Sequence, residues 1–387
     1  MKISFLQFLD KYVGLPLCVL LTIIKKMLPS REQRIEKDTV KKILIMKFWG
    51  LGSILLLSPT VLGCRKTFPH ARLVFLTLSK NNDVTRSLNL FDEIITLDVD
   101  HGWLFFVRTL AASILYFWRE RFDLVIDSEF FTRFSAIITF LTFARVTVGY
   151  HSWETWRGDI HTIKVPFNRY WHIMDNFYNL GTRLGIDKNT SLEIVKPVIT
   201  KDDQKIVDDL MAENGLSRGC VAVHANVSDL SVERRWPYKN FEQLIERLLL
   251  HYPIQVVFIG AKSERESVRE IISNIHCQGI ADLVGKLTIS QLAYFFENAK
   301  LVIANDSGPL HLAVAMGTPT VSFFGPETPL IYGPRGEHHT VFFKNTDCSP
   351  CMNVHNRKSV QCYWRTPACM EAITVDEVYA VVQAKLS

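Results

Sequence analysis

The sequence predicts an α/β chain of two Rossmann-like domains that face each other across a cleft. Short apolar segments typical of buried parallel strands alternate with longer helical segments through both halves of the chain. A linker around residues 188–201, which contains Pro197, separates the halves. The length of 387 residues exceeds that of one ordinary domain, and an apolar content of 48% is enough to fill two cores.

The N-terminal Rossmann-like domain is expected to span residues 39–195. Runs rich in Ile, Leu and Val predict its strands, and longer apolar stretches between them predict its helices. In chain order these elements are the strand Ile43–Met46, helix Ile54–Cys64, strands Leu73–Leu78 and Glu93–Leu97, helix Trp103–Trp118, strand Leu124–Asp127, helix Phe131–Phe143 and strand Val146–Tyr150. The segment Trp153–Trp171 is aromatic and charged without a period, which predicts a loop near a binding surface.

The C-terminal Rossmann-like domain is expected to span residues 196–387 and to repeat this pattern after a charged helix, Lys201–Asn214. Its further predicted elements are the strand Val221–Ala225, helix Phe241–Leu250, strand Gln255–Ile259, helices Glu264–Ile275 and Ser290–Ala299, strand Leu301–Ala304, helix His311–Met316, strand Thr320–Phe324 and helix Thr374–Leu386. No short-period sequence repeat is visible in the chain.

Residues 1–38 form a separate N-terminal segment and link. The apolar run Tyr12–Ile24 is flanked by Lys11 and by Lys25 and Lys26, and it is shorter than the roughly 20 residues that span a bilayer. No small-residue cleavage site follows it, so a signal peptide is disfavoured. The segment is predicted to be helical and to lie in a membrane interface, and the alternative is a helix packed on the protein's own surface. The charged stretch Ser30–Asp38 is the link.

The formal net charge of +5 is too small to indicate nucleic-acid binding, and no nucleic-acid-binding motif is present. This surplus fits an anionic membrane surface or a phosphorylated substrate. Cys18, Cys64, Cys220 and Cys277 lie singly in apolar surroundings, which predicts core thiols and a reducing compartment.

The most informative segment is the polar loop that follows the strand Leu301–Ala304. Its sequence is Asn305-Asp306-Ser307-Gly308-Pro309, and His311 follows in the first turn of a small-residue helix. In open parallel sheets, ligands bind at the carboxyl ends of strands, and a helix start favours a phosphate. The alternative is that Asp306 and Ser307 only cap the helix.

Together with Phe324-Gly325-Pro326-Glu327-Thr328 and Tyr332-Gly333-Pro334, this loop resembles the donor-site signature of glycosyltransferase family 9, the bacterial heptosyltransferases. The resemblance covers nearly everything from Lys42 to the C-terminus. It implies the GT-B fold and an inverting transfer of a sugar, heptose from ADP-heptose, to a lipid-linked saccharide such as lipopolysaccharide core. It also implies a cytoplasmic protein held on the inner face of the bacterial inner membrane, with a nucleotide sugar as co-substrate and no required cofactor.

The resemblance assigns donor-binding roles residue by residue. Asp306, Ser307, Gly308 and His311 would contact the diphosphate and sugar. Arg234, two residues before Trp236-Pro237, would bind a donor phosphate, and a guanidinium suits forked phosphate contact. The further implied residues are Asn226 in a hydroxyl-rich stretch, Glu264 on the nucleoside and Leu287 in the base pocket. The alternatives are a solvated surface Arg234 and a Glu264 that only satisfies a helix start.

The N-terminal loop Lys47–Ser53 departs from the family pattern, because Ser53 stands where the family has its general base, an aspartate. A serine hydroxyl cannot act as a base near neutral pH, so Ser53 is predicted to be a helix N-cap. Glu129 is the candidate base in its place, with Asp127 second. The alternative makes Asp127 a helix cap and Glu129 a rim charge. Lys47 and Arg133 would bind an anionic acceptor.

Four cysteines gather near the C-terminus. Cys348, Cys351, Cys362 and Cys369 could hold a structural zinc ion, although the second pair is spaced too widely for a standard zinc ribbon. Reduced thiols or a disulfide are the alternatives. No Asp-x-Asp motif of the metal-dependent transferases is evident, so a metal-independent reaction is expected.

Three rival functions stay open at this point. The first is a related transferase with another donor or acceptor, which Ser53 favours. The second is an inactive scaffold that still binds a nucleotide sugar. The third, a nicotinamide-dependent dehydrogenase, is weak because the Gly50-x-Gly52 loop lacks a third glycine in register.

Overall fold

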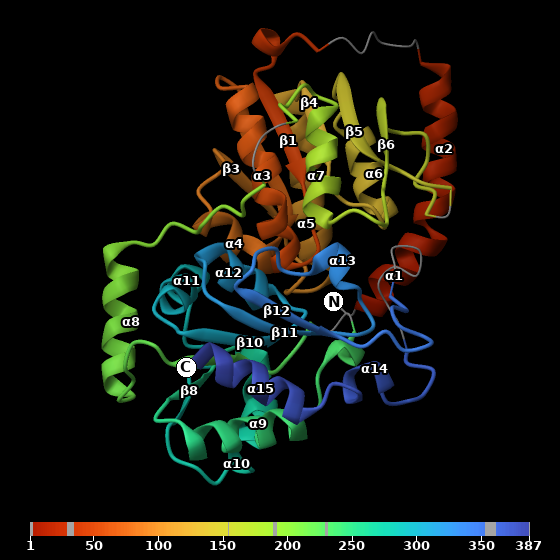
Figure 1. Ribbon diagram of the computed structural model, residues 1–387. Coiled ribbons are helices and arrows are strands. Elements are labelled where there is room, and N and C mark those ends of the chain that lie inside the picture. Colours follow the sequence, from red (N-terminus) through yellow and green to blue (C-terminus); the bar gives the residue numbers. More distant parts are fainter. Residues whose placement is uncertain are drawn as a thin grey trace. The chain divides into compact units, whose positions relative to one another are not determined.

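The computed structural model describes residues 3–28, 35–153, 155–188, 192–228, 231–352 and 361–386. The chain divides into two compact units, Met1–Ile194 (unit 1) and Val195–Ser387 (unit 2). Each unit is built around a six-stranded sheet in which all the neighbouring strands are parallel (Figure 1). The prediction of an α/β chain with two Rossmann-like domains is therefore confirmed.

The sheet of unit 1 has the strand order β3-β2-β1-β4-β5-β6. Its strands are β1 (Lys42–Met46), β2 (Arg72–Leu78), β3 (Glu93–Leu97), β4 (Leu124–Asp127), β5 (Val146–His151) and β6 (Ile163–Pro166). β1 lies at the centre between β2 and β4. The chain leaves β1 and β4 at the same edge of the sheet because the strands are parallel, and the loops that follow there contain Lys47 and Glu129.

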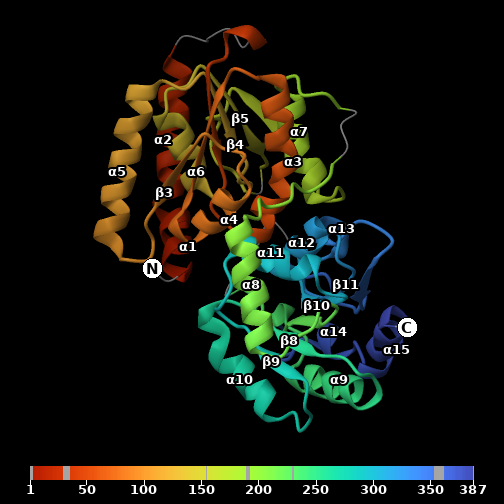
Figure 2. The same ribbon diagram turned by 90° about the vertical axis from the view of Figure 1, so that its left-hand side faces the viewer.

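Helices cover both faces of this sheet. They are α3 (Leu51–Thr67), α4 (Asn82–Ser87), α5 (Trp103–Glu120), α6 (Arg133–Leu141) and α7 (Ile173–Thr182). In Figure 2, α3 and α7 lie on one face of the sheet, and α5 and α6 lie on the other. Buried side chains from β1, β2 and β4 pack against α5 and α6 in a core that includes Phe106, Phe117 and Ile138.

Two N-terminal helices, α1 (Ile3–Tyr12) and α2 (Gly14–Met27), extend the helical layer that contains α5 and α6 (Figure 2). Cys18 on α2 is fully buried against Ala136 of α6 and Ile160. The predicted helical character is confirmed. No helix among the described residues has both the length and the apolar character to cross a membrane.

Polar contacts fix α1 and α2 to the rest of unit 1. The carboxylate of Asp10 accepts hydrogen bonds from the backbone N–H groups of Arg133 (2.6 Å) and Phe134 (3.0 Å), which caps the start of α6. The Lys25 ammonium donates to the carbonyl oxygens of Asp159, Ile160 and His161. The inner faces of these helices therefore pack on the protein's own surface. Most of the predicted link Ser30–Asp38 lies outside the described residues.

The sheet of unit 2 has the order β12-β11-β10-β7-β8-β9. Its strands are β7 (Val221–His224), β8 (Val256–Phe258), β9 (Ile280–Asp282), β10 (Leu301–Asn305), β11 (Thr320–Phe324) and β12 (His339–Phe343). Its helices are α8 (Lys201–Glu213), α9 (Tyr238–His251), α10 (Arg265–Ser273), α11 (Ile289–Glu297), α12 (Gly308–Met316), α13 (Pro329–Tyr332), α14 (Ala368–Glu371) and α15 (Val375–Leu386).

Three differences from the sequence prediction have a physical cause. The segment Trp153–Trp171, predicted to be a loop, contains β6, a four-residue edge strand that ends at Pro166 and pairs with β5. The edge strands β9 and β12 were not predicted. They carry few fully buried side chains and therefore lack the apolar run that marks a central strand. α12 starts at Gly308 rather than His311, because Pro309 is accommodated in the first turn.

Candidate active site

The donor-type loop of unit 2 leaves β10 and enters α12. Ser307 is the residue before α12, but its side chain makes no capping hydrogen bond to that helix. Its hydroxyl oxygen instead lies 3.0 Å from Nδ1 of His224, at the end of β7. The alternative in which Ser307 only caps the helix is therefore wrong. The positive end of α12 receives no side-chain cap from Ser307, an arrangement suited to an anion.

His224 also contacts the next loop of the sheet. Its Nε2 atom lies 3.3 Å from Oε2 of Glu264, which additionally accepts a 2.7 Å hydrogen bond from the backbone N–H of Ala261. Burial raises the pKa of Glu264, but the hydrogen bond and charge of His224 outweigh it, so the pKa is lowered and the carboxyl is ionised at neutral pH. A Cβ at Gly260 would meet Glu264 Oε2 at 2.4 Å, so a larger residue there would move this carboxylate from its present position.

Arg234 joins the loop after β7 to the donor-type loop. Its Nη1 atom donates to both the carbonyl and the carboxylate oxygen Oδ2 of Asp306, each at 3.0 Å, and its Nη2 donates to Ser228 at 2.7 Å. The Arg234 side chain is 13% exposed, and that of Asp306 is 7% exposed. Arg234 is thus not a freely solvated surface residue, since it is fixed beside the start of α12.

Packing and hydrogen bonds position this arginine. Two residues after it, the Trp236 ring is fully buried and stacks on Phe323 of β11. The backbone N–H of Trp236 donates to Asn305 Oδ1 at 2.8 Å, and Asn305 Nδ2 donates to the Ala225 carbonyl at 2.8 Å. The loop after β7 is therefore attached to the end of β10 by the Asn305 side chain and to β11 by the stacked Trp236–Phe323 pair.

Two further predicted donor residues line the same sheet edge. The Asn226 side chain is 5% exposed and bonds to the hydroxyls of Tyr238 and Ser267. Leu287 is half-buried between β9 and α11. The turn before it contacts the Glu264 loop, because the Gly285 N–H donates to the Gly260 carbonyl at 2.8 Å. Their donor-binding roles stay predictions.

In unit 1, Glu129 anchors the loop after β1. Its Oε1 atom accepts from the backbone N–H groups of Phe48 (2.7 Å) and Trp49 (3.1 Å), and the Lys47 ammonium lies 2.9 Å away. Lys47 is 1% exposed and Glu129 is 0% exposed. Glu129 is therefore not a rim charge. Its second oxygen, Oε2, has no hydrogen-bond partner among the described residues.

Asp127 lies in a separate, fully buried network. Its Oδ2 atom contacts the guanidinium of Arg157, His161 Nε2 at 3.0 Å and the Ser135 hydroxyl at 3.1 Å. Burial raises the pKa of Asp127, but Arg157 and the His161 hydrogen bond outweigh it and hold the pKa below its usual value. Asp127 does not cap α6, since the carboxylate at that helix start belongs to Asp10. These contacts favour a structural role for Asp127.

The remaining unit 1 candidates lie near these networks. Ser53 occupies the third position of α3, which begins at Leu51 after Gly50, so the prediction that Ser53 is the N-cap is wrong. Helix α3 starts earlier because Gly50 adopts a positive φ that turns the chain three residues sooner. Arg133 donates from Nε to the Trp156 carbonyl at 3.0 Å and lies 3.5 Å from Asp10 Oδ2. Its acceptor-binding role, like that of Lys47, stays a prediction.

The comparison with protein families decides what this architecture is. Residues 116–363, more than half of the chain, match glycosyltransferase family 9 (heptosyltransferase). The chain belongs to glycosyltransferase family 9. The protein is accordingly a glycosyltransferase of the GT-B type, and the dehydrogenase and inactive-scaffold alternatives are set aside.

Relatives and solved structures agree with this membership. The chain is 23% identical over 312 residues to the lipopolysaccharide core heptosyltransferase OpsX of Haemophilus influenzae, which covers 77% of this chain and 82% of that protein. A family 9 glycosyltransferase from Veillonella parvula has the same fold, with a TM-score of 0.74, 21% identity and coverage of 92% of this chain and 99% of the other. The structure of the ADP-heptose LPS heptosyltransferase II of E. coli matches with a TM-score of 0.70 and 16% identity, and the match covers 89% of this chain and 98% of the other.

The C-terminal cysteines of this family 9 protein do not form a metal site in the described structure. No group of three or more metal-binding side chains occurs among the described residues, which include Cys348, Cys351, Cys362 and Cys369. None of these four cysteines forms a disulfide, and burial raises the pKa of Cys369 to about 11. The structure therefore does not support the zinc hypothesis.

Three of the other four cysteines are buried, as predicted for core thiols. Cys18, Cys64 and Cys220 are buried thiols, and Cys277 is half-buried. Burial raises the pKa of Cys64 to about 12, so this thiol is protonated and inert.

An Asp-x-Asp triplet does occur in unit 1, at Asp98-Val99-Asp100 after β3. The Asp98 carboxylate accepts from the backbone N–H groups of Asp100 (2.9 Å) and His101 (3.1 Å) and contacts the His101 ring at 2.7 Å. This triplet is thus bound into its own turn and lies outside the donor-type loops of unit 2.

Sequence reasoning missed several residues of these networks. His224 stands two residues before the predicted donor residue Asn226, and its place at a strand end was the available signal. Arg157 and His161 fall in the aperiodic segment after β5, where no pattern indicated a partner for Asp127. Asp10 lies 123 residues from the helix start that it caps, and no local signal links the two.

Proposed function

We propose that this family 9 glycosyltransferase transfers heptose from ADP-heptose to a lipid-linked saccharide, namely the core of a lipopolysaccharide. Two similar proteins support the choice: the Haemophilus relative is named a lipopolysaccharide core heptosyltransferase, and the E. coli structure is that of an ADP-heptose LPS heptosyltransferase. The observation that carries the proposal is the cluster of Arg234, Asp306, His224, Ser307 and Glu264 at the carboxyl edge of the unit 2 sheet.

Each side of this cluster suits one part of a nucleotide diphosphate sugar. Arg234 and the start of α12 supply positive charge for the diphosphate, because guanidinium N–H groups remain beyond those that Asp306 and Ser228 accept. Glu264 supplies an ionised carboxylate for ribose hydroxyls. Asp306 and His311 would contact the sugar, with Gly308 allowing close approach, and Asn226 and Leu287 would complete the nucleoside side.

The reaction would invert the configuration at the anomeric carbon. The acceptor hydroxyl oxygen attacks this carbon, the bond to the diphosphate oxygen breaks, and the bonding electron pair leaves with ADP. Arg234 and the α12 terminus stabilise the negative charge that develops on ADP. One carboxylate must take the hydroxyl proton, and Glu129 is our choice since its Oε2 atom is unpartnered, whereas Asp127 is saturated.

The acceptor and the cellular site complete the proposal. Lys47 and Arg133 are the proposed contacts for an anionic acceptor from unit 1. Because the acceptor would carry a lipid, we place the protein in the cytoplasm, peripherally bound to the inner face of the bacterial inner membrane. The nucleotide sugar is the only co-substrate required in this proposal.

The test is turnover by the purified protein. ADP release from ADP-heptose is measured with and without a lipopolysaccharide core acceptor, for the unmodified protein and for Arg234→Gln. We expect acceptor-dependent ADP release, with the donor KM at least about tenfold higher in Arg234→Gln because a charged hydrogen bond to phosphate is lost.

Arg235→Gln is the matched control. Arg235 is the neighbouring residue, and its guanidinium lies over the Tyr238 ring, 4.1 Å from the centroid, and bonds to the Tyr238 hydroxyl. The donor KM of the Arg235→Gln variant should stay within about twofold of the value for the unmodified protein. Equal effects of the two substitutions would contradict the role assigned to Arg234.

A second candidate within the same family uses another donor or acceptor. The observation that favours it is Ser53 in the place of the family aspartate. A panel of nucleotide sugars in a thermal-shift assay separates the two, since stabilisation by ADP-heptose alone supports the heptosyl donor and its absence rejects it.

A further inference from the structure

Large apolar side chains are exposed on one set of helices in unit 1. On α5 they are Trp103, Leu104, Phe105, Val107, Leu115 and Trp118, and the Leu104 and Leu115 side chains are 76% and 62% exposed. On α1 and α2 they include Phe8, Tyr12, Leu17, Leu20, Ile23, Ile24 and Met27. A folded monomer rarely exposes so many apolar groups on neighbouring elements unless they contact another apolar surface.

These helices belong to one layer. Figure 2 shows α5, α6 and α2 on the same face of the unit 1 sheet. Trp118 of α5 donates from Nε1 to the Leu141 carbonyl at the end of α6, and its ring contacts Phe143. The partly buried Ile137 and Phe140 of α6 pack in the cluster that contains Cys18 of α2. The exposed residues of α5 and α2 therefore form one apolar face, which we call the α2–α5 face.

The charges on these helices have one sign. Among the described side chains of α1, α2 and α5, the exposed ones that are charged at neutral pH are Lys11, Lys26, Arg108 and Arg119, all of them basic. The acidic residues of these helices are turned inward. Asp10 caps α6, and Glu120 pairs with Lys42 at 2.9 Å. The exposed apolar groups of these three helices are thus accompanied by exposed charges of positive sign.

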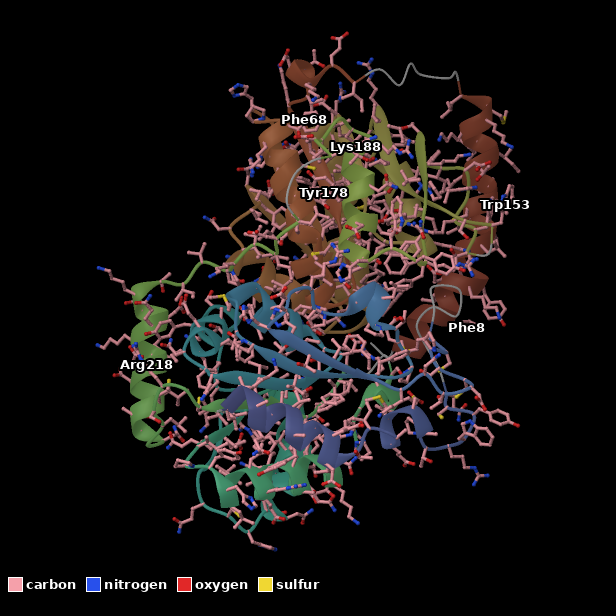
Figure 3. The ribbon with its side chains drawn as sticks, viewed as in Figure 1. Phe8, Phe68, Trp153, Tyr178, Lys188 and Arg218 are labelled. Atoms are coloured by element: carbon pink, nitrogen blue, oxygen red, sulfur yellow. The ribbon has the colours of Figure 1, made fainter. Side chains whose placement is uncertain are left out.

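We propose that the α2–α5 face binds the surface of an anionic lipid bilayer, with α5 as a second membrane-contacting helix beside α1 and α2. Apolar side chains would enter the acyl boundary, and the lysines and arginines would contact the phosphates of the headgroups. Two tryptophans near the ends of α5, Trp103 and Trp118, suit the headgroup level. Figure 3 places Phe8 and Trp153 at the outer edge of unit 1, where both are exposed.

A second copy of the chain is a poorer occupant of this face. A two-fold interface would bring the same basic residues together from both copies, and such like-charge contacts are unfavourable. Anionic lipids supply the opposite charge. The inference rests on the proposed function in one respect: a lipid-linked acceptor gives the enzyme a reason to lie on a bilayer.

The test is sedimentation of the full chain with phospholipid vesicles. Vesicles of phosphatidylcholine alone are compared with vesicles that also contain phosphatidylglycerol, at low and high salt. We expect binding to the anionic vesicles that weakens at high salt. The double substitution Leu104→Glu with Leu115→Glu should lower the partition coefficient at least about tenfold, because it places two carboxylates on the face that meets the lipid.

Leu250→Glu is the matched control, since Leu250 is a 73% exposed leucine on α9 of unit 2. It should leave vesicle binding unchanged. Absence of binding to anionic vesicles, or binding equally strong in the α5 double variant, would overturn the inference. A dimer in solution that the α5 substitutions dissociate would also overturn it and favour a second copy.

A second readout keeps this inference separate from the proposed function. ADP release from ADP-heptose is measured without vesicles and with a soluble, delipidated acceptor. The α5 double variant should retain the unmodified rate in this assay. Transfer by the unmodified protein without any binding to anionic vesicles contradicts the membrane face alone, and vesicle binding by the unmodified protein without transfer contradicts the proposed function alone.

Discussion

The two units share one architecture but arrange their polar residues differently at the carboxyl ends of the strands. In unit 1, Asp127 and Glu129 are fully buried, and cationic side chains hold both. In unit 2, the Arg234–Asp306 pair and Glu264 keep partial exposure, and the guanidinium retains unused donors. A parallel sheet thus provides the same edge twice. The unit 1 edge buries its carboxylates in internal ion pairs and leaves Oε2 of Glu129 unpartnered, whereas the unit 2 edge keeps its ion pair partly exposed.

The outer surfaces differ as well. The exposed large apolar side chains of unit 1 concentrate on α1, α2 and α5, whereas those of unit 2, such as Leu250 and Leu330, are scattered over separate elements. The comparison indicates a division of labour, in which unit 1 combines structural networks with a docking face and unit 2 carries the donor site.

The largest expected difference concerns stability. Asp127→Ala leaves the buried Arg157 guanidinium without its counter-charge and should lower the free energy of unfolding by about 3–5 kcal/mol. Asp306→Ala, the same substitution in the partly exposed pair of unit 2, should cost about 1–2 kcal/mol. Urea denaturation of both variants measures the two values. Equal costs would remove the distinction between the buried and the partly exposed ion pair.

The next effect concerns catalysis by Glu129. Glu129→Gln should lower kcat about 10²-fold or more with little change in the donor KM, because it removes the proposed base. Glu264→Gln in unit 2 should instead raise the donor KM and change kcat less. Steady-state kinetics with ADP-heptose separates the two patterns.

A structural role of Glu129 needs its own control. Lys47→Met breaks the same buried ion pair but keeps the carboxylate. If, at saturating acceptor, Lys47→Met lowered kcat as much as Glu129→Gln, with an unchanged pH profile, Glu129 would act only by holding the loop after β1.

The smallest effect is a pH dependence of unit 1. Burial lowers the pKa of His161 below its usual value of 6.5, against the hydrogen bond from Asp127. Below about pH 6.5 the unfolded chain therefore binds a proton that the folded chain does not, and stability falls as the pH falls. The loss is at most about 1.4 kcal/mol per pH unit for this one group.

Urea denaturation at pH 7.5 and 5.5 measures this dependence. The lowered pKa of Asp127 acts in the same direction, but only as the pH falls below the usual Asp value of 3.8. His161→Gln should flatten the dependence between pH 6.5 and 5.5. A variant with the unmodified slope would show that His161 contributes nothing to it.

Local sequence patterns predicted most of the fold. The segment 301–324 has an apolar run, a polar break with glycine and proline, a small-residue helix and a second apolar run. Each of these signals is strong by itself. Residues 163–166 gave no such signal, because an edge strand with one buried residue does not differ in composition from a loop.

The candidate site was less accessible to this reasoning. The type and position of Ser307 fit a helix cap as well as a ligand contact, and the contact that decides the matter comes from His224, 83 residues away. The partners of Asp127 likewise come from residues 157 and 161, beyond the next strand. Long-range pairing of polar side chains has no period, so a single sequence does not contain the signal.

The cap that Asp10 places on α6 has a consequence for the order of synthesis. Asp10 is synthesised 123 residues before Arg133, whose backbone N–H donates to the Asp10 carboxylate. At the usual rate of about 5–20 residues per second, this delay lasts roughly 6 to 25 s. During that interval α1 and α2 have made none of their contacts with α6, and their apolar side chains meet whatever surface lies near the ribosome. The growing chain therefore has an opportunity to settle on lipid before unit 1 has folded.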